Sequence, residues 1–269
     1  MTTLPITEAV ELELADNWLT VWFAQPERRN PLTDEVVAEL LQLCEVLRER
    51  RNIRGLTLRG RGGYFCAGGD LRGFKALAQG NSDAAIASSC SIGELLACVN
   101  ALPQVTVALL EGAAMAGGLG LACCCDVTVG TTDTRFAFSE TRLGISPAQI
   151  ARFVLQKCGY ATGRRLLLTA ARFDGTKALD YGLLDEVVSS PSALDEVEQT
   201  LRAQVLACAP GAVAATKALI TQIAAVPDDE KVSFAADNFS QCLQSPEGLE
   251  GVSAFLEKRT PNWHLEGDE

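Results

Sequence analysis

Residues 112–126 read GAAMAGGLGLACCCD, a run of fourteen uncharged residues that contains four glycines and closes on Asp126. Small residues let a helix backbone approach a neighbouring strand closely, so packing alone would explain the run. Glycines at the start of a helix also expose unpaired backbone N–H groups, which stabilise a negatively charged oxygen. The run therefore has two interpretations, tight packing and ligand binding.

Composition limits the class of protein around this run. The chain has 269 residues, of which 48% are hydrophobic and 21% charged, enough to bury a large core in one or two domains. Its net charge of −11 repels nucleic acid and anionic lipid. The N-terminus has no signal-peptide pattern, and the fourteen-residue run is shorter than a membrane span needs. We expect a cytoplasmic protein that binds neither nucleic acid nor membrane.

The ten cysteines and the single histidine argue against a metal site. No two cysteines are three positions apart, Cys123, Cys124 and Cys125 are consecutive, and His264 is near the end of the chain. Consecutive side chains point in different directions, so they do not converge on one ion. The sequence therefore predicts reduced structural cysteines, and it leaves carboxylates as the leading candidates for acid–base chemistry.

The spacing of apolar residues predicts alternating strands and helices, followed by a helical region. The predicted strands are VELELAD (10–16), WLTVWFAQ (18–25), RGLTLRG (54–60), QVTVALLEG (104–112), DVTVG (126–130), RFAFSE (135–140) and LDEVV (184–188), with early helices at 33–51 and near 91–101. This order predicts an α/β core at residues 1–190 and a helical region at residues 191–269.

Two glycine-rich turns each follow a predicted strand. FCAGGD (65–70) follows one strand and AMAGGLG (114–120) follows another. If the two turns converge, their N–H groups form a hole for a carbonyl oxygen that becomes anionic during a reaction. Two ordinary tight turns would have the same spacing, so spacing alone leaves the question open.

The second turn also suggests a dinucleotide site. Gly118 and Gly120 follow a strand, and Glu140 lies twenty residues further on, as in a nucleotide-binding fingerprint. However, Cys123 stands where the third glycine belongs, and the helix before residue 126 is short for a crossover. An NAD-dependent oxidoreductase is therefore the weaker interpretation.

Four segments together resemble the crotonase (enoyl-CoA hydratase/isomerase) superfamily. They are FCAGGDL (65–71), EGAAMAGGLGLACCCD (111–126), RFAFSETRLGI (135–145) and GVSAFLEKRTPNW (251–263), and RRNPLT (28–33) precedes them. The resemblance implies a crotonase-like spiral of ββα turns with a C-terminal helical trimerisation region. It also implies an acyl-CoA thioester as substrate, a homotrimer or dimer of trimers, and no cofactor, because coenzyme A is part of the substrate.

The resemblance assigns catalytic roles to three residues. The N–H groups of Gly69 and Gly117 match the oxyanion-hole donors, and Glu140 matches one of two glutamates that hydratases of this family use. The position of the other glutamate is Gly120 in this chain. A single carboxylate is compatible with hydration and with double-bond isomerisation. Because the second family glutamate is missing, a non-catalytic acyl-CoA-binding protein also stays open.

The resemblance further implies a set of substrate-binding residues, in which the arginines line the CoA entrance and the last two residues reach CoA from a neighbouring subunit. The set is Arg28, Arg29, Ala67, Gly68, Asp70, Leu71, Gly118, Gly120, Leu143, Phe255 and Lys258. Asp70 and Asp126 are expected to anchor loops, because short acids beside glycine turns bond nearby backbone N–H groups.

One segment points to a finer substrate class. GISPAQIARFV (144–154) resembles hydratases that act on branched glutaconyl-type thioesters, such as isohexenylglutaconyl-CoA in the breakdown of acyclic terpenes. Such a substrate carries a second carboxylate, which calls for a cation in a protein of this charge. Arg142 and Arg152 flank its first part, GISPAQIA (144–151), and they are candidates for this contact or for a structural ion pair.

Overall fold

The computed structural model describes residues 3–264 and is built around a six-stranded sheet of order β1-β2-β3-β4-β6-β8. β1 and β2 are antiparallel, and every other neighbouring pair is parallel. The strands are β1 (Val10–Ala15), β2 (Trp18–Phe23), β3 (Gly55–Gly60), β4 (Val105–Leu110), β6 (Val127–Thr131) and β8 (Glu186–Val188).

A second, two-stranded sheet pairs β5 (Ala113–Met115) with β7 (Arg135–Ala137) in parallel. Cys66 forms a bridge to Ala114, so the chain after β3 also reaches this sheet. The chain therefore repeats one pattern three times. A strand of the large sheet (β3, β4 or β6) is followed by a short segment in or beside the small sheet (Cys66, β5 or β7, respectively). This repetition and the C-terminal helices confirm the predicted α/β crotonase-like architecture.

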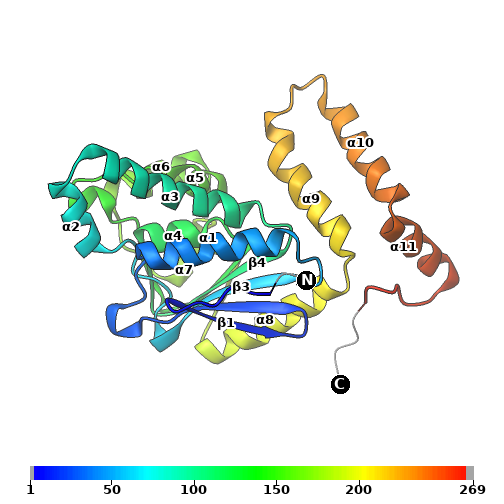
Figure 1. Cartoon of the computed structure of the whole chain (residues 1–269), viewed down its shortest axis with the longest axis horizontal. Coiled ribbons are helices and arrows are strands. Elements are labelled where there is room, and N and C mark those ends of the chain that lie inside the picture. The colour runs from blue at the N-terminus through cyan, green and yellow to red at the C-terminus, as the bar shows by residue number, and fades with distance from the viewer. Residues whose placement is uncertain (1–2, 265–269) are drawn as a thin grey trace.

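Figure 1 shows α1 (Asp34–Arg48) and α3 (Ser82–Asn100) on one face of the large sheet. The Thr33 side chain caps α1 by accepting a hydrogen bond from the Val36 N–H at 3.3 Å, and Asp34 and Glu35 follow in the first turn. The helix ends three residues before the predicted Arg51. Its apolar stripe is buried in the core, at Val36, Val37, Leu40, Leu43, Cys44 and Leu47.

The helix expected near residues 91–101 is longer than predicted, and another helix precedes it. α3 begins at Ser82, where the Asn81 side chain accepts a hydrogen bond from Ala84 N at 2.9 Å. α2 (Leu71–Gln79) was not predicted. Within residues 3–264, α3 is the one helix whose length and composition would allow it to cross a membrane, although its last turns pack in the core through Leu95, Leu96 and Val99.

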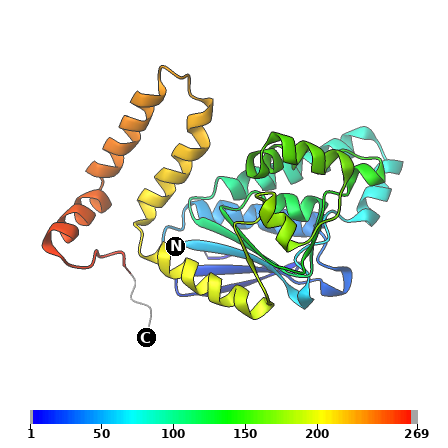
Figure 2. The ribbon, with the colours of Figure 1, turned by 180° about the vertical axis from the view of Figure 1, so that it is seen from behind.

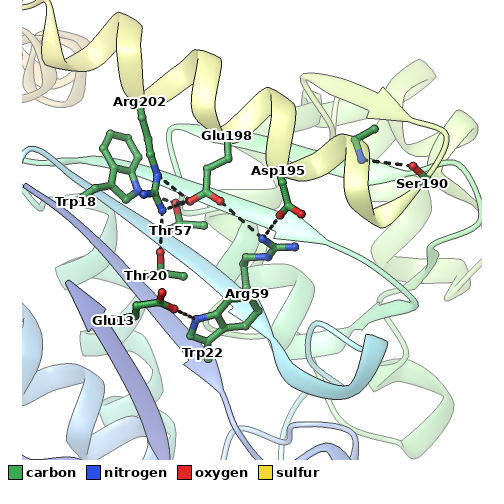
Figure 3. A network of polar contacts seen from close by, with 11 residues as sticks. Glu13, Trp18, Thr20, Trp22, Thr57, Arg59, Ser190, Asp195, Glu198 and Arg202 are labelled. Carbon is green, nitrogen blue, oxygen red and sulfur yellow. Dashed lines mark hydrogen bonds and ion pairs between the residues drawn. The ribbon is translucent and has the colours of Figure 1, made fainter. Parts of the chain in front are cut away.

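α8 (Pro191–Leu206) covers the opposite face of the sheet, where a polar network holds it (Figure 3). The buried Glu198 carboxylate accepts hydrogen bonds from Thr57 Oγ1 at 2.6 Å and from Arg202 at 2.7 Å. Thr57 Oγ1 in turn accepts one from the indole N–H of Trp18 at 2.8 Å. Arg59 reaches Asp195 on the same helix. Because these polar groups satisfy one another, α8 packs on the sheet as part of the core.

The last helices extend away from the sheet and from α8 (Figures 1 and 2). They are α9 (Pro210–Gln222), α10 (Lys231–Gln244) and α11 (Pro246–Glu257). Lys217 joins α9 to the core through an ion pair with Asp126 at 2.6 Å. Since α8 packs on the sheet, the separate helical arm begins near residue 210, later than the predicted boundary at residue 190.

The opening run of sequence becomes β5, the seven-residue helix α4 (Ala116–Ala122) and three buried cysteines. Burial raises the pKa of the Cys123, Cys124 and Cys125 thiols, to about 12 for Cys125, so all three stay protonated at neutral pH. They pack in the core, as predicted. The remaining helices of the core are α5 (Ala151–Cys158), α6 (Tyr160–Thr169) and α7 (Gly175–Asp180).

Candidate active site

The two glycine-rich turns lie against each other. Gly68 has φ +91°, a conformation that favours glycine, and a Cβ there would lie 2.8 Å from the Met115 carbonyl oxygen and 3.0 Å from Ala116 Cβ. Leu32 N donates a hydrogen bond to Gly68 O at 2.8 Å. These close contacts press the loop after Cys66 onto the start of α4, which brings the two predicted donors together.

Gly69 follows Gly68 in the first turn, and Gly117 follows Ala116 in the second. A Cβ on Gly117 would lie 3.9 Å from Gly69 N. Gly117 is the second residue of α4, so its N–H has no acceptor within the helix, and within residues 3–264 neither N–H donates a hydrogen bond. Two free backbone donors therefore sit beside one cavity, in the arrangement that an oxyanion requires.

Glu140 faces the same cavity from the start of η3, the short 3-10 helix Glu140–Leu143 that follows β7. Its side chain is buried, and Oε2 has no hydrogen-bond partner in the described part of the chain. Burial raises the pKa of the Glu140 carboxyl above its ordinary value, while a hydrogen bond to its own backbone acts in the opposite direction. Buried carboxylates are normally paired, so this unpaired oxygen indicates a functional group.

The cavity has a volume of about 500 Å³ and extends from these glycines to α2 and α3. Its walls are largely apolar. One part of the wall is formed by Leu32, Ala67, Gly69, Ala116, Gly117, Ser139 and Glu140. α2 and α3 contribute Leu71, Phe74, Leu77, Ala78, Ala85, Ser88, Ser89 and Ile92. The segment after Glu140 contributes Leu143, Ile145, Ser146, Pro147, Ala148, Gln149 and Ile150.

Gly120 and Gly118 make packing contacts and do not line this cavity. A Cβ on Gly120 would lie 2.1 Å from Ile150 Cγ2 and 2.6 Å from Ile150 Cβ. A Cβ on Gly118 would lie 2.6 Å from Cys66 Sγ. The isoleucine therefore fills the space into which a side chain at position 120 would project, and the wall there carries no ionisable group.

Several other predicted binding residues lie outside the cavity lining. Arg28 pairs with Asp70 at 2.9 Å, and Asp70 also caps α2 by accepting a hydrogen bond from Arg72 N at 3.1 Å. This confirms the anchoring role expected of Asp70. Phe255 and Lys258 lie on and just after α11, in the arm that stands away from the core, so within one chain they are separate from the cavity (Figure 1).

A second cleft adjoins the cavity, and Ala67, Leu71 and Ser139 line both. Its walls carry four guanidinium groups, from Arg29, Arg135, Arg142 and Arg172. In a protein of net charge −11, this cleft is a local concentration of positive charge next to the free N–H groups.

The sequence leaves open whether Arg142 and Arg152 contact a second carboxylate or form structural ion pairs. Arg142 Nε donates to the Ala170 carbonyl at 3.2 Å and lies in the second cleft. The guanidinium of Arg152 lies 4.2 Å from the centroid of the Phe153 ring, on an exposed part of α5. Neither residue lines the cavity, because η3 and α5 direct both side chains away from it.

Sequence reasoning missed the residues that form the far wall of the cavity. Phe74 and Leu77 belong to the unpredicted α2, and Ser88, Ser89 and Ile92 lie on the α3 face that turns toward the cavity. The spacing of the α3 residues matches one helix face, and this periodicity was the available signal.

Comparison with known proteins shows the family of this chain. The family model described as enoyl-CoA hydratase/isomerase matches residues 14–266. The chain belongs to the enoyl-CoA hydratase/isomerase family. Its fold is the crotonase fold of that family, and the protein is an enoyl-CoA hydratase of the crotonase superfamily.

Individual crotonase relatives match over nearly the whole chain. The structure of AtuE from Pseudomonas aeruginosa has 39% sequence identity and a TM-score of 0.93, covering 96% of this chain and 100% of AtuE. An enoyl-CoA hydratase/isomerase from Marinobacter aquaeolei has 34% identity and a TM-score of 0.92, covering 96% and 99%. The mitochondrial enoyl-CoA hydratase domain-containing protein 2 of Homo sapiens is 32% identical over 244 residues, 89% of this chain and 82% of that protein. The crotonase fold removes the dinucleotide-binding interpretation of the glycine-rich run.

Proposed function

We propose that this crotonase hydrates its enoyl-CoA substrate with Glu140 as the only acid–base residue and with the N–H groups of Gly69 and Gly117 as the oxyanion hole. The observation that carries the proposal is the buried, unpaired Oε2 of Glu140 in the same cavity as two free backbone donors. The apolar contact between Gly120 and Ile150 supports a single carboxylate, because it leaves no space for a second one.

The reaction then proceeds with one proton that leaves and returns. The Glu140 carboxylate takes a proton from water as the water oxygen bonds to the β-carbon of the enoyl group. The double-bond electrons move toward the thioester, and the negative charge on its oxygen is stabilised by Gly69 N–H and Gly117 N–H. Protonated Glu140 then gives its proton to the α-carbon, so the net change is the addition of one water molecule.

Replacement of Glu140 by glutamine tests this mechanism. Glu140→Gln keeps the shape of the side chain, and it should lower turnover by ~10²–10⁴ while leaving CoA-thioester binding near the wild-type level. Binding is measured by titration calorimetry with a saturated acyl-CoA. Turnover within threefold of the wild type would refute the role of Glu140 and of the single-acid mechanism.

We further propose that the acyl group is a branched glutaconyl-type chain, such as isohexenylglutaconyl-CoA from acyclic terpene breakdown. The resemblance of residues 144–154 to hydratases of such thioesters supports this, as does a largely apolar cavity of about 500 Å³. The test compares kcat/KM for a branched dicarboxyl enoyl-CoA with that for crotonyl-CoA. A tenfold preference for crotonyl-CoA would refute it, and a double-bond shift without gain of water would assign the protein to the isomerases.

We propose that the C-terminal arm joins copies of the chain into a trimer or a dimer of trimers. The arm exposes apolar side chains that a monomer would leave in water, namely Ile220, Val232, Phe239, Leu243, Leu249, Val252, Phe255 and Leu256. In such an assembly Phe255 and Lys258 would contribute to the CoA site of a neighbouring copy. The arginine-lined second cleft supplies the positive charge that the phosphates of CoA require.

A further inference from the structure

The acyl cavity contains a polar pair on an otherwise apolar wall. The Gln149 side-chain amide donates a hydrogen bond through Nε2 to Ser89 Oγ at 2.9 Å. Both residues line the cavity and are half-buried. They are sixty residues apart in sequence, and the bond connects the segment after Glu140 to α3.

A glycine on α3 makes this contact possible. Gly93 lies one helical turn after Ser89, and a Cβ there would lie 2.4 Å from Gln149 Oε1. The Gln149 side chain therefore rests directly on the α3 backbone, where any larger residue at position 93 would displace it. Glycine in a helix interior is unfavourable, so the close fit of the amide offsets a local cost to the helix.

The pair keeps unused hydrogen-bond donors. Within residues 3–264, the Ser89 hydroxyl accepts a bond but donates none, and the second N–H of the Gln149 amide has no protein acceptor. The Ser88 hydroxyl lines the same wall and is also without a protein partner in the described residues. A carboxylate accepts several hydrogen bonds, so two or three neutral donors on one wall match its chemistry.

Charged donors are absent from this wall. Among the described residues that line the cavity, none is lysine, arginine or histidine. A second carboxylate on the acyl group therefore has no cation to pair with inside the cavity of one chain. Hydrogen bonds from neutral donors to a charged acceptor are stronger than bonds between neutral groups, so the pair can discriminate without an ion pair.

We propose that Gln149 and Ser89 are specificity-determining residues that bind the second carboxylate of a branched dicarboxyl enoyl-CoA. The proposal rests on the proposed substrate class and extends it, by replacing an arginine contact with a neutral hydrogen-bonding pair. Gln149 holds one carboxylate oxygen through its free N–H, and Ser89 donates its hydroxyl hydrogen to the same group. This contact fixes the far end of the acyl chain relative to Glu140.

The test compares three thioesters in the wild type and in variants of the full-length protein. The substrates are a branched dicarboxyl enoyl-CoA, its distal methyl ester, which has a similar shape without the charge, and crotonyl-CoA. Gln149→Met keeps the length of the side chain and removes its hydrogen bonds, and Gln149→Glu places a like charge beside the substrate. Ser91→Ala is the matched control, since the Ser91 hydroxyl bonds to Ala87 O of its own helix at 3.2 Å and does not line the cavity.

We expect Gln149→Met and Ser89→Ala each to lower kcat/KM for the dicarboxyl substrate by about 10- to 100-fold, with changes below threefold for the methyl ester and crotonyl-CoA. Gln149→Glu should cause the larger loss for the dicarboxyl substrate. Equal losses for all three substrates would overturn the proposal, and so would unchanged preference in both variants. If the wild type itself does not prefer the dicarboxyl substrate over its methyl ester, the proposed substrate class is wrong as well. That outcome is visible in the wild-type measurements alone, so it is distinguishable from a failure of the Gln149 and Ser89 roles only.

Discussion

The contact between Gly120 and Ile150 makes a sharp prediction about stability. Gly120 lies inside α4 without a positive φ, so the backbone itself accepts alanine there, and alanine favours a helix over glycine by about 0.5–1 kcal/mol. However, the added methyl would lie 2.1 Å from Cγ2 and 2.6 Å from Cβ of the buried Ile150. Both are atoms at or next to a stiff β-branched centre, so the neighbour cannot swing aside cheaply.

Overpacking of this kind costs about 1–3 kcal/mol, which outweighs the gain in helix propensity. We therefore expect Gly120→Ala to lower the free energy of unfolding by about 1–2 kcal/mol. Ile150→Ala alone should cost about 2–5 kcal/mol, because it empties a buried site. In that background the sign reverses, and adding Gly120→Ala should raise stability, since the new methyl occupies the vacated space.

The assay is urea unfolding of the wild type, both single variants and the double variant, at one fixed protein concentration because assembly contributes to stability. The double-mutant cycle should give a favourable coupling of about 1–3 kcal/mol. Gly73→Ala is the control, because the nearest atom to a Cβ at this α2 position is Asp70 Cβ at 4.0 Å, and it should be neutral or stabilising. If Gly120→Ala were as stable as the wild type and additive with Ile150→Ala, the steric reasoning would be wrong.

Four other predictions can be tested on the same protein. Because burial raises the pKa of Glu140, kcat/KM should fall with decreasing pH through a value above that of an ordinary glutamate, and a fall only near the ordinary value would contradict this. The same raised pKa means that the wild type loses stability relative to Glu140→Gln as pH rises from the unfolded value through the folded one, which urea unfolding at several pH values measures. Thr57→Val should cost about 1–3 kcal/mol with catalysis retained, because it leaves the Trp18 N–H and a Glu198 oxygen without their hydroxyl partner, and an unchanged unfolding midpoint would contradict it. Light scattering should give the mass of a trimer or hexamer, and Phe239→Asp on exposed α10 should shift it toward the monomer; a monomeric wild type would refute the assembly.

The sequence predicted the strands of the large sheet well because they are short apolar or alternating runs. Residues 10–16 alternate and residues 18–25 run largely apolar between turns, and the structure pairs the two segments as β1 and β2. α2 and the first half of α3 were missed for a physical reason. Their apolar residues Leu71, Phe74 and Ile86 remain partly exposed and face the cavity or solvent, so the helical spacing of these segments does not mark a stripe buried in the core.

The candidate site was predictable where local sequence fixes the backbone and unpredictable where side chains meet across elements. Gly69, Gly117 and Glu140 lie in recognisable segments, and the structure brings them to one cavity. Arg142 was a plausible neighbour of the acyl group by sequence distance, yet the turn of η3 directs it to Ala170 O instead. The bond between Gln149 and Ser89 depends on the meeting of two distant segments, which spacing alone does not specify.

The loss of a second carboxylate changes what decides the reaction in this cavity. In the proposed mechanism Glu140 both takes and returns the proton, because the wall at Gly120 is closed by an isoleucine side chain. A raised pKa makes the Glu140 carboxylate a better base for the proton of water and the Glu140 carboxylic acid a weaker donor to the α-carbon. The free energies of the two proton transfers therefore become less unequal. The same group would serve either hydration or a double-bond shift, depending on which carbon lies beside Oε2 and whether water reaches it. Binding of the far end of the acyl chain by Gln149 and Ser89 would set that distance, so substrate position selects the reaction that one carboxylate performs.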